Sequence, residues 1–144
     1  MTKKRTGEPW KTAAVYGREL TGLSLNLLVR DVARSLPFYR DVLGFVVEYS
    51  DVDFAALARD SVRVQLHADH TYDGMPWAKR LRAAGKRGFG AEIRLMGIDP
   101  DAAERAARAR GDTILVATAD TPHGWRECIF EDPDGYTFAV GVAR

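Results

Sequence analysis

The residues best suited to chemistry in this chain are polar side chains that alternate with apolar ones in short stretches. Glu92 is the leading candidate. It is predicted to lie at the centre of a strand, on the polar face that points inward, where a carboxylate needs a partner. It can contact a ligand or exchange a proton, or it can form an ion pair with Arg94 or with Arg63. Asn26 and Gln65 each carry a donor and an acceptor, which suits groups that orient a ligand, although either can equally bond to neighbouring side chains.

A histidine and several aromatic residues complete the set of candidates. His67 shares a face with Gln65 at the end of a predicted strand, where a hydrogen-bonded histidine is more common than a catalytic one. Aromatic rings can stack on a ligand, so Trp125 in a loop, Trp77 in a connector and Tyr49 in a strand are further candidates for binding. Cys128, the single cysteine, has no evident base beside it and is predicted to lie in the core.

The elements that position these residues follow from the alternation of apolar and polar residues. Residues 23–29 predict a strand with one apolar face, and a helix is expected to begin at Asp31 and end at Gly44, with Pro37 near its first turn. Three short strands are predicted at about 45–50, 53–58 and 61–67. The first half therefore has the order β-α-β-β-β.

The second half repeats this order. Residues 91–99 have the same alternation as the first strand, and an Ala- and Arg-rich helix from Asp101 to Arg110 is expected to end at Gly111. Three strands are predicted at about 113–118, 125–131 and 136–142, with a tight turn from Asp132 to Gly135 before the last one. We divide the chain into an N-terminal extension (1–21), a first module (22–68), a connector with a short helix (69–88) and a second module (89–144).

Composition narrows the class of protein. A length of 144 residues with a net charge of +1 suits one soluble globular domain and gives no sign of a nucleic-acid or membrane partner. The lone cysteine excludes a disulfide framework and favours a cytoplasmic protein. The pattern from Trp10 to Leu20 predicts a short amphipathic segment that can stabilise a dimer.

Three motifs resemble one known family. The pairs Phe38-Tyr39 and Leu43-Gly44, together with the turn from Asp132 to Gly135, are similar to those of the vicinal oxygen chelate superfamily. That superfamily includes glyoxalases, bleomycin-resistance proteins, fosfomycin-resistance enzymes and extradiol dioxygenases. The resemblance implies an α+β fold in which two β-α-β-β-β modules form curved mixed sheets around a shared groove, often in a homodimer.

The resemblance also indicates where metal-dependent members hold their ion. The corresponding positions here are Ser24, Gln65, Glu92 and Ala139. Ser24 is a poor ligand and Ala139 is none, so the two remaining donors are too few to hold a divalent ion tightly. We therefore expect no metal and no other cofactor, as in the bleomycin-resistance type.

Three interpretations remain open at this stage: ligand binding, an atypical enzyme, and a structural or regulatory dimer that binds no ligand. The first is metal-independent binding or sequestration of a small, partly aromatic compound, such as an antibiotic, by Glu92, Asn26, Gln65, Ser24, His67, Arg94, Trp125, Trp77 and Tyr49. The alternative is a metal-dependent lyase, isomerase or dioxygenase with an atypical site, in which His67 replaces a missing ligand beside Glu92. No residue is assigned a catalytic role.

Overall fold

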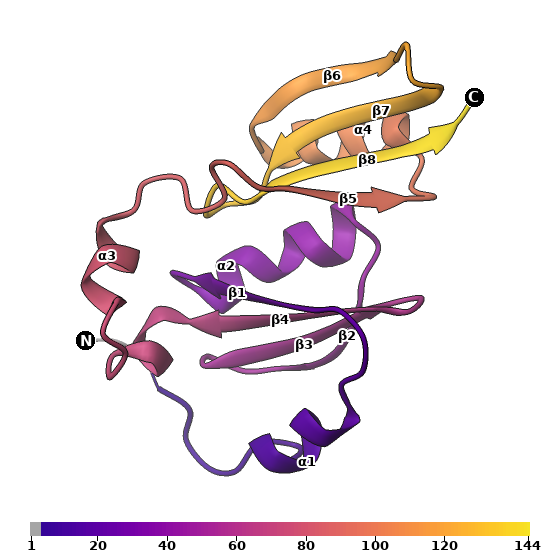
Figure 1. Ribbon diagram of the computed structural model, residues 1–144. Helices are drawn as coiled ribbons and strands as arrows, with labels where there is room; N and C mark the ends of the chain where they lie inside the picture. Colours follow the sequence, from indigo (N-terminus) through magenta and orange to yellow (C-terminus); the bar gives the residue numbers. More distant parts are fainter. Residues whose placement is uncertain (1–3) are drawn as a thin grey trace. The chain divides into compact units, whose positions relative to one another are not determined.

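The protein consists of two compact units, each built around a four-stranded mixed sheet. The computed structural model describes residues 4–144, so the first three residues of the predicted extension lie outside it. The first unit holds the chain up to Leu36 and from Gly44 to Ala83, and the second holds Pro37–Leu43 and Ala84–Arg144. Strand order is β1-β4-β3-β2 in one sheet and β5-β8-β7-β6 in the other, which confirms the predicted α+β class with two β-α-β-β-β units (Figure 1).

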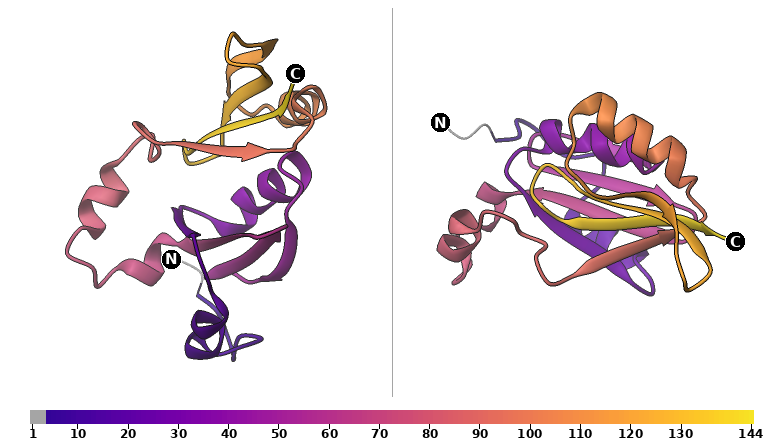
Figure 2. Two further views of the ribbon diagram at one scale, coloured as in Figure 1. Left: turned by 45° about the vertical axis from the view of Figure 1, so that its right-hand side comes forward. Right: turned by 90° about the horizontal axis from the view of Figure 1, so that it is seen from above.

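The first unit places a helix on each face of its sheet. In chain order its elements are α1 (Ala13–Glu19), β1 (Ser24–Val29), α2 (Val32–Pro37), β2 (Val46–Ser50), β3 (Phe54–Arg59), β4 (Val62–Ala68), the short 3-10 helix η2 (Asp69–Tyr72) and α3 (Ala78–Ala83). Strand β1 is parallel to β4, and the other neighbours are antiparallel. Two views show α2 on one side of this sheet and α1 on the other (Figures 1 and 2).

The two faces of the first sheet differ as the alternation predicts. Val29, Leu57, Val64 and Leu66 are fully buried on the apolar side. On the other side the register aligns Asn26 of β1 with Gln65 of β4, and His67 of β4 with Phe54 of β3. This polar face is the one that α1 approaches.

The second unit repeats the order with one additional helical turn. Its elements are η1 (Phe38–Val42), β5 (Glu92–Met96), α4 (Pro100–Arg110), β6 (Ile114–Asp120), β7 (Trp125–Glu131) and β8 (Thr137–Ala143). Helix α4 begins where the Asp99 carboxylate accepts hydrogen bonds from the N–H groups of Asp101 and Ala102, and it ends at Gly111 with φ of 79°. The sequence predicted a helix from Asp101 to Arg110 that ends at Gly111, so the observed helix begins one residue earlier than expected and ends where expected.

The helix after β1 differs from the prediction at Pro37. We expected Pro37 in the first turn of one regular helix, but it is the last residue of α2, and η1 continues as a π-helical turn. A proline has no N–H and its ring collides with the carbonyl four residues earlier, so the regular hydrogen-bond pattern cannot pass through it. The wider turn is closed by the Leu43 N–H, which donates to the Phe38 carbonyl at 3.2 Å.

This turn delivers aromatic residues to the core of the second unit. Phe38 and Tyr39 are fully buried, and the Phe38 ring lies 5.6 Å from that of Phe130 and 5.8 Å from that of Phe138. The Tyr39 hydroxyl donates to the Asp132 carboxylate at 2.7 Å. The second sheet is therefore covered by its own helix α4 and by a segment that precedes β2 in the chain.

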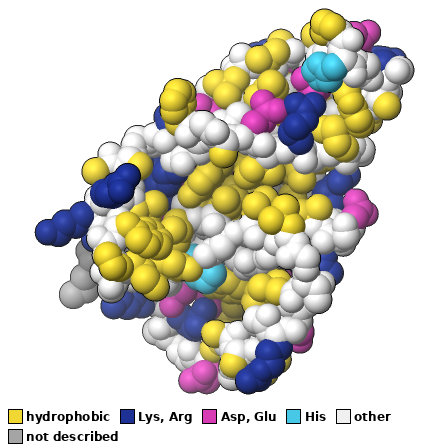
Figure 3. Space-filling view, viewed as in Figure 1, with side chains coloured by type: hydrophobic (Ala, Val, Ile, Leu, Met, Phe, Trp, Pro, Cys, Tyr) yellow, Lys and Arg dark blue, Asp and Glu magenta, His cyan; other side chains and the backbone are white. Residues whose placement is uncertain are grey.

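The surface and the helices bear on the expectation of no nucleic-acid or membrane partner. Positive and negative side chains are interspersed on the face seen in Figure 3. Within residues 4–144, no helix is both long enough and apolar enough to cross a membrane.

Candidate functional site

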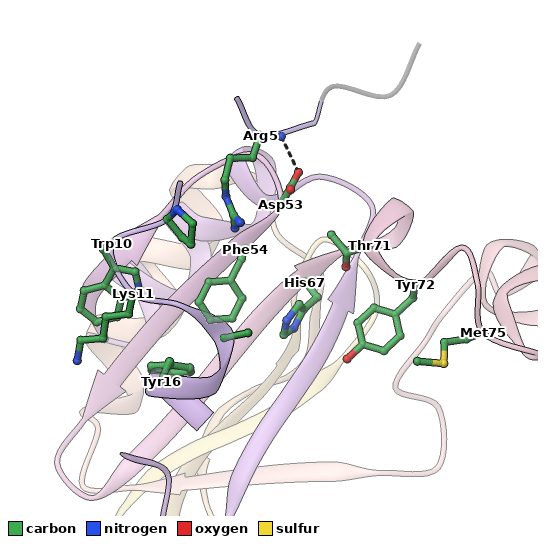
Figure 4. A pocket seen from close by; sticks show the side chains of 12 residues that line it. Arg5, Trp10, Lys11, Tyr16, Asp53, Phe54, His67, Thr71, Tyr72 and Met75 are labelled. Carbon is green, nitrogen blue, oxygen red and sulfur yellow. Dashed lines mark hydrogen bonds between the residues drawn. The ribbon is translucent and has the colours of Figure 1, made fainter. Parts of the chain in front are cut away.

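A pocket lies on the polar face of the first sheet, under the N-terminal segment from Arg5 to Glu19. Its cavity has a volume of about 430 Å³, which falls in the range of small-molecule sites. Three parts of the first unit line it: the N-terminal segment, the end of the sheet and the η2 region after β4 (Figure 4). The lining residues are Arg5, Pro9, Trp10, Lys11, Ala13, Tyr16, Asp53, Phe54, His67, Thr71, Tyr72 and Met75.

The inner wall of the pocket is aromatic. The His67 ring lies 4.8 Å from the Phe54 ring and 5.5 Å from the Tyr72 ring, and the latter pair meets edge to face. Tyr16 from α1 contacts Phe54 edge to face at 5.6 Å. These four rings come from four different elements, so the wall forms only when those elements pack together.

His67 is held in one orientation by two neighbours. Its Nδ1 lies 2.5 Å from the Asn26 Oδ1, and the Asn26 Nδ2 donates to the Tyr72 hydroxyl at 2.7 Å. Burial lowers the pKa of the His67 imidazole, and the positive charge of Arg5 lowers it further. The imidazole is therefore neutral near pH 7.

The charged residues around the pocket are mutually compensated. The Arg5 guanidinium forms an ion pair with Asp51, and the Arg5 backbone N–H donates to the Asp53 carboxylate at 2.9 Å. Asp53 also accepts from His70 Nε2 at 2.7 Å. Burial works to raise the pKa of Asp51, but hydrogen bonds from Arg5 and Tyr49 outweigh it and hold that pKa below its ordinary value.

Aromatic contacts hold the N-terminal segment on the sheet. Trp10 stacks on Tyr49 of β2, with ring centroids 5.5 Å apart and planes within 2° of parallel. The Lys11 ammonium lies over the Trp10 ring, 4.5 Å from its centroid, and forms an ion pair with Glu19. Tyr49, which we predicted as a ligand-binding residue, therefore supports a pocket wall.

Ser24 and Gln65 form a closed hydrogen-bonded cluster with Tyr16. The Ser24 hydroxyl donates to Gln65 Oε1 at 3.0 Å, and Gln65 Nε2 donates to the Ser24 and Tyr16 hydroxyl oxygens at 2.7 and 3.3 Å. Gln65 is 5 % exposed. Both polar ends of its side chain are thus occupied by protein partners.

The remaining predicted residues lie in the second unit or outside the pocket. Arg94 donates to Glu92 at 2.7 Å and to Glu127 at 2.6 Å, so Glu92 has the ion-pair partner that we considered. Trp125 begins β7 in the hairpin turn that contains Thr121, and Trp77 contacts the Tyr72 ring at 5.4 Å. Ala139 is fully buried in β8.

The four positions that the family resemblance implies for a metal ion offer few free donor atoms in this structure. Ser24 and Gln65 are bonded to each other, Glu92 is paired with Arg94, and Ala139 has no donor atom. Among residues 4–144, no group of three or more histidine, cysteine or acidic side chains is arranged to hold a metal ion. The convergence of Ser24 and Gln65 with Glu92 and Ala139 stays a prediction.

Sequence reasoning missed the contribution of the N-terminal segment. Arg5, Trp10, Lys11 and Tyr16 line the pocket, yet we assigned that stretch to an extension that can brace a dimer. One local signal was available: Thr12 caps α1 through a hydrogen bond from the Val15 N–H at 3.2 Å. That signal indicates a helix but not the surface on which it packs.

The buried thiol is placed as predicted. Cys128 lies on β7 with no exposed surface, and burial raises the pKa of its thiol to about 11. A thiol at this pKa is protonated at neutral pH and is a poor nucleophile.

The fold and the pocket together define an α+β protein of paired β-α-β-β-β units with an aromatic-walled cavity in the first. The chain belongs to the Glyoxalase/Bleomycin resistance protein/Dioxygenase superfamily, which its sequence matches over residues 23–140. No curated protein matches the chain. Residues 1–22, which supply half of the pocket lining, precede the matched region.

Several solved structures share the fold. A glyoxalase/bleomycin resistance protein/dioxygenase family enzyme from Burkholderia phytofirmans PsJN has a TM-score of 0.69 and 21% identity, covering 84% of this chain and 97% of that one. The fosfomycin resistance protein FosX from Listeria monocytogenes has a TM-score of 0.64 and 15% identity, covering 87% and 95%. Hypothetical protein SA1046 from S. aureus has a TM-score of 0.68 and 18% identity, covering 90% and 99%.

Proposed function

We propose that this protein binds a small, partly aromatic organic compound in the pocket of the first unit, without a metal ion. The observation that carries this proposal is the cavity of about 430 Å³ walled by Tyr16, Phe54, His67 and Tyr72. A cavity of this kind, mostly apolar with a few fixed polar groups, is typical of small-molecule sites. Aromatic walls favour planar ligands, because stacked and edge-to-face ring pairs contribute beyond the area they bury.

Metal independence is supported by the donor chemistry. A divalent ion needs three or more imidazole, carboxylate or similar ligands, and the positions concerned supply one paired carboxylate and one amide that is already bonded. Under this proposal the protein acts as a member of the bleomycin-resistance type, as the sequence resemblance led us to expect.

The predicted residues take different parts in this proposal. Within it, His67 contacts the ligand, Asn26 fixes His67, and Gln65, Ser24 and Tyr49 hold the N-terminal segment in place. A role for Glu92, Arg94, Trp125 and Trp77 in binding stays a prediction. So do a homodimer, a cytoplasmic location and an antibiotic as the ligand.

Titration of the intrinsic fluorescence with a library of small aromatic compounds tests the proposal. Trp10 lines the pocket, so binding there is expected to change its emission. Phe54→Leu removes part of the aromatic wall and is expected to weaken binding about tenfold, the equivalent of one lost aromatic contact.

A matched control is available in the second unit. Phe89 is 95% exposed, so Phe89→Leu is expected to leave the affinity unchanged. If no compound binds tighter than millimolar, or if Phe54→Leu and Phe89→Leu behave alike, the proposed function is wrong.

A further inference from the structure

The hydrogen bonds around His67 bear on which ring nitrogen carries its proton. Asn26 Nδ2 donates to the Tyr72 hydroxyl, and the Asn26 Oδ1 faces His67 Nδ1. A carbonyl oxygen can only accept, and Nδ1 must therefore carry the hydrogen. In a neutral imidazole the other nitrogen, Nε2, then has a free lone pair.

That lone pair is available to the pocket. Among residues 4–144, His67 Nε2 has no hydrogen-bond partner, and His67 lines the cavity between Phe54 and Tyr72 (Figure 4). This nitrogen is not fully buried, so water can reach it in the absence of a ligand. A ligand that donates a hydrogen bond can take the place of that water.

The cations near the pocket are already used and do not call for an acidic ligand. Lys11 Nζ lies 2.6 Å from the Glu19 carboxylate, and the Arg5 guanidinium pairs with Asp51. An anionic ligand would have to replace one of these pairs. A neutral donor does not.

We infer that the pocket selects neutral aromatic compounds that bear a phenolic hydroxyl, with His67 Nε2 accepting the hydroxyl hydrogen. The inference rests on the proposed function, since it assigns the class of ligand to the same pocket. The ring of the ligand lies among Phe54, Tyr72 and Tyr16, and Asn26 acts as a positioning residue that fixes the His67 tautomer.

The test compares two ligands of nearly equal shape. 2-Naphthol donates a hydrogen bond, and 2-methoxynaphthalene does not. In ligand-detected NMR titrations we expect 2-naphthol to bind the wild-type protein about tenfold tighter, the effect of one buried hydrogen bond. His67→Phe keeps a ring between Phe54 and Tyr72 but has no acceptor, so it is expected to abolish the preference for 2-naphthol over 2-methoxynaphthalene.

A control and a second measurement make the result independent of variant folding. His123→Phe replaces a half-exposed histidine of the second unit and is expected to retain the tenfold preference. Imidazole nitrogen NMR of the wild-type protein is expected to show a protonated Nδ1 and an unprotonated Nε2 for His67.

The outcomes separate this inference from the proposed function. Equal affinities for the two naphthalenes, or an Nε2-protonated His67, overturn the hydroxyl assignment while binding in the pocket stands. If neither naphthalene binds tighter than millimolar but other library compounds do, the hydroxyl assignment also falls and the binding function again stands. If nothing in the library binds, both fall.

Discussion

At the scale of single residues, Asp132 shows how burial produces a titration that is absent from the unfolded chain. Its carboxylate is 4% exposed, accepts from the Tyr39 hydroxyl at 2.7 Å and accepts from the N–H groups of Asp134 and Tyr136. Burial raises the pKa of Asp132 from 3.8 to about 6, and these hydrogen bonds offset only part of that rise.

This pKa predicts a pH-dependent contribution to stability. The folded protein keeps the Asp132 proton up to about pH 6, whereas the unfolded chain releases it near pH 3.8, so the free energy of unfolding falls as pH rises through this interval. Asp132→Asn preserves the shape and removes the titration. We expect the stability of the wild type relative to this variant to fall by about 2 kcal/mol between pH 4 and pH 7.

Urea unfolding of both proteins at several pH values measures the difference. Other carboxylates, such as Glu104 with its pKa lowered to about 2, contribute equally to both proteins and cancel. A difference that does not change between pH 4 and pH 7 contradicts the assignment.

Gly88 lies where no side chain fits. A Cβ at this position would approach the Tyr136 Cα to 2.6 Å and the Gly135 carbonyl oxygen to 2.9 Å. Both are backbone atoms of the Asp132–Gly135 turn region, which cannot shift easily. We predict that Gly88→Ala lowers the free energy of unfolding by about 1–3 kcal/mol, as over-packing does elsewhere.

Gly74 provides the comparison for this substitution. A Cβ there meets no atom within 4 Å, and its φ is not in the left-handed region. Gly74→Ala is expected to leave the thermal unfolding midpoint within a few degrees of the wild type. Equal midpoints for Gly74→Ala and Gly88→Ala would refute the steric argument.

The sequence predicted part of the site at this scale. Asn26, Gln65 and His67 were found because strand alternation places them on the polar face of adjacent strands. Arg5 and Trp10 were missed because they reach the sheet through tertiary contacts with Asp51 and Tyr49, and no periodicity in residues 4–12 encodes those partners. The sequence therefore predicted the polar face of the first sheet, but it did not predict that the N-terminal segment packs over that face.

At the scale of elements, the N-terminal segment is the addition that turns an open sheet face into a pocket. It is held by the Trp10–Tyr49 stack, the Arg5–Asp51 ion pair and the Tyr16–Gln65 hydrogen bond. Helix α1 has seven residues, too few to be stable without these contacts. The cover therefore depends on its tertiary contacts more than on its own helical propensity.

Trp10→Ala tests that dependence. We predict faster amide hydrogen exchange across residues 5–16 and an affinity for pocket ligands reduced at least tenfold, because the variant removes the stacked anchor and part of the wall. Trp77→Ala is the matched control for the exchange measurement, since Trp77 has the same exposed fraction of 39% but lies outside the segment. Unchanged exchange in Trp10→Ala would show that the segment is held by other contacts.

The strands and helix α4 were predicted well because their sequence signals are local. Residue alternation marks β1, β4 and β8, and Asp99 and Gly111 mark both ends of α4. The π-helical turn η1 could not be predicted in the same way. Pro37 indicates an interruption, but the choice of a wider turn follows from the burial of Phe38 and Tyr39 against Phe130 and Phe138.

At the scale of the whole molecule, the boundary between the two units does not follow the boundary between the two sequence repeats. The second unit consists of residues 84–144 together with Pro37–Leu43, which stand between β1 and β2 in the chain. Phe38 and Tyr39 supply two of the largest fully buried side chains of the protein. The second repeat therefore lacks part of its core when taken alone.

This arrangement predicts the behaviour of a fragment. Residues 84–144 expressed alone would lose the contacts of Phe38 with Phe130 and Phe138 and leave the buried Asp132 carboxylate without the Tyr39 hydroxyl. Removal of one buried phenylalanine typically costs about 3–5 kcal/mol, a large part of the total stability of a small domain. We expect this fragment to show no cooperative thermal transition and weak near-ultraviolet circular dichroism. Phe38→Ala in the full chain is expected to lower stability by the same few kcal/mol, whereas a fragment that unfolds cooperatively would show that the second repeat needs no help from the first.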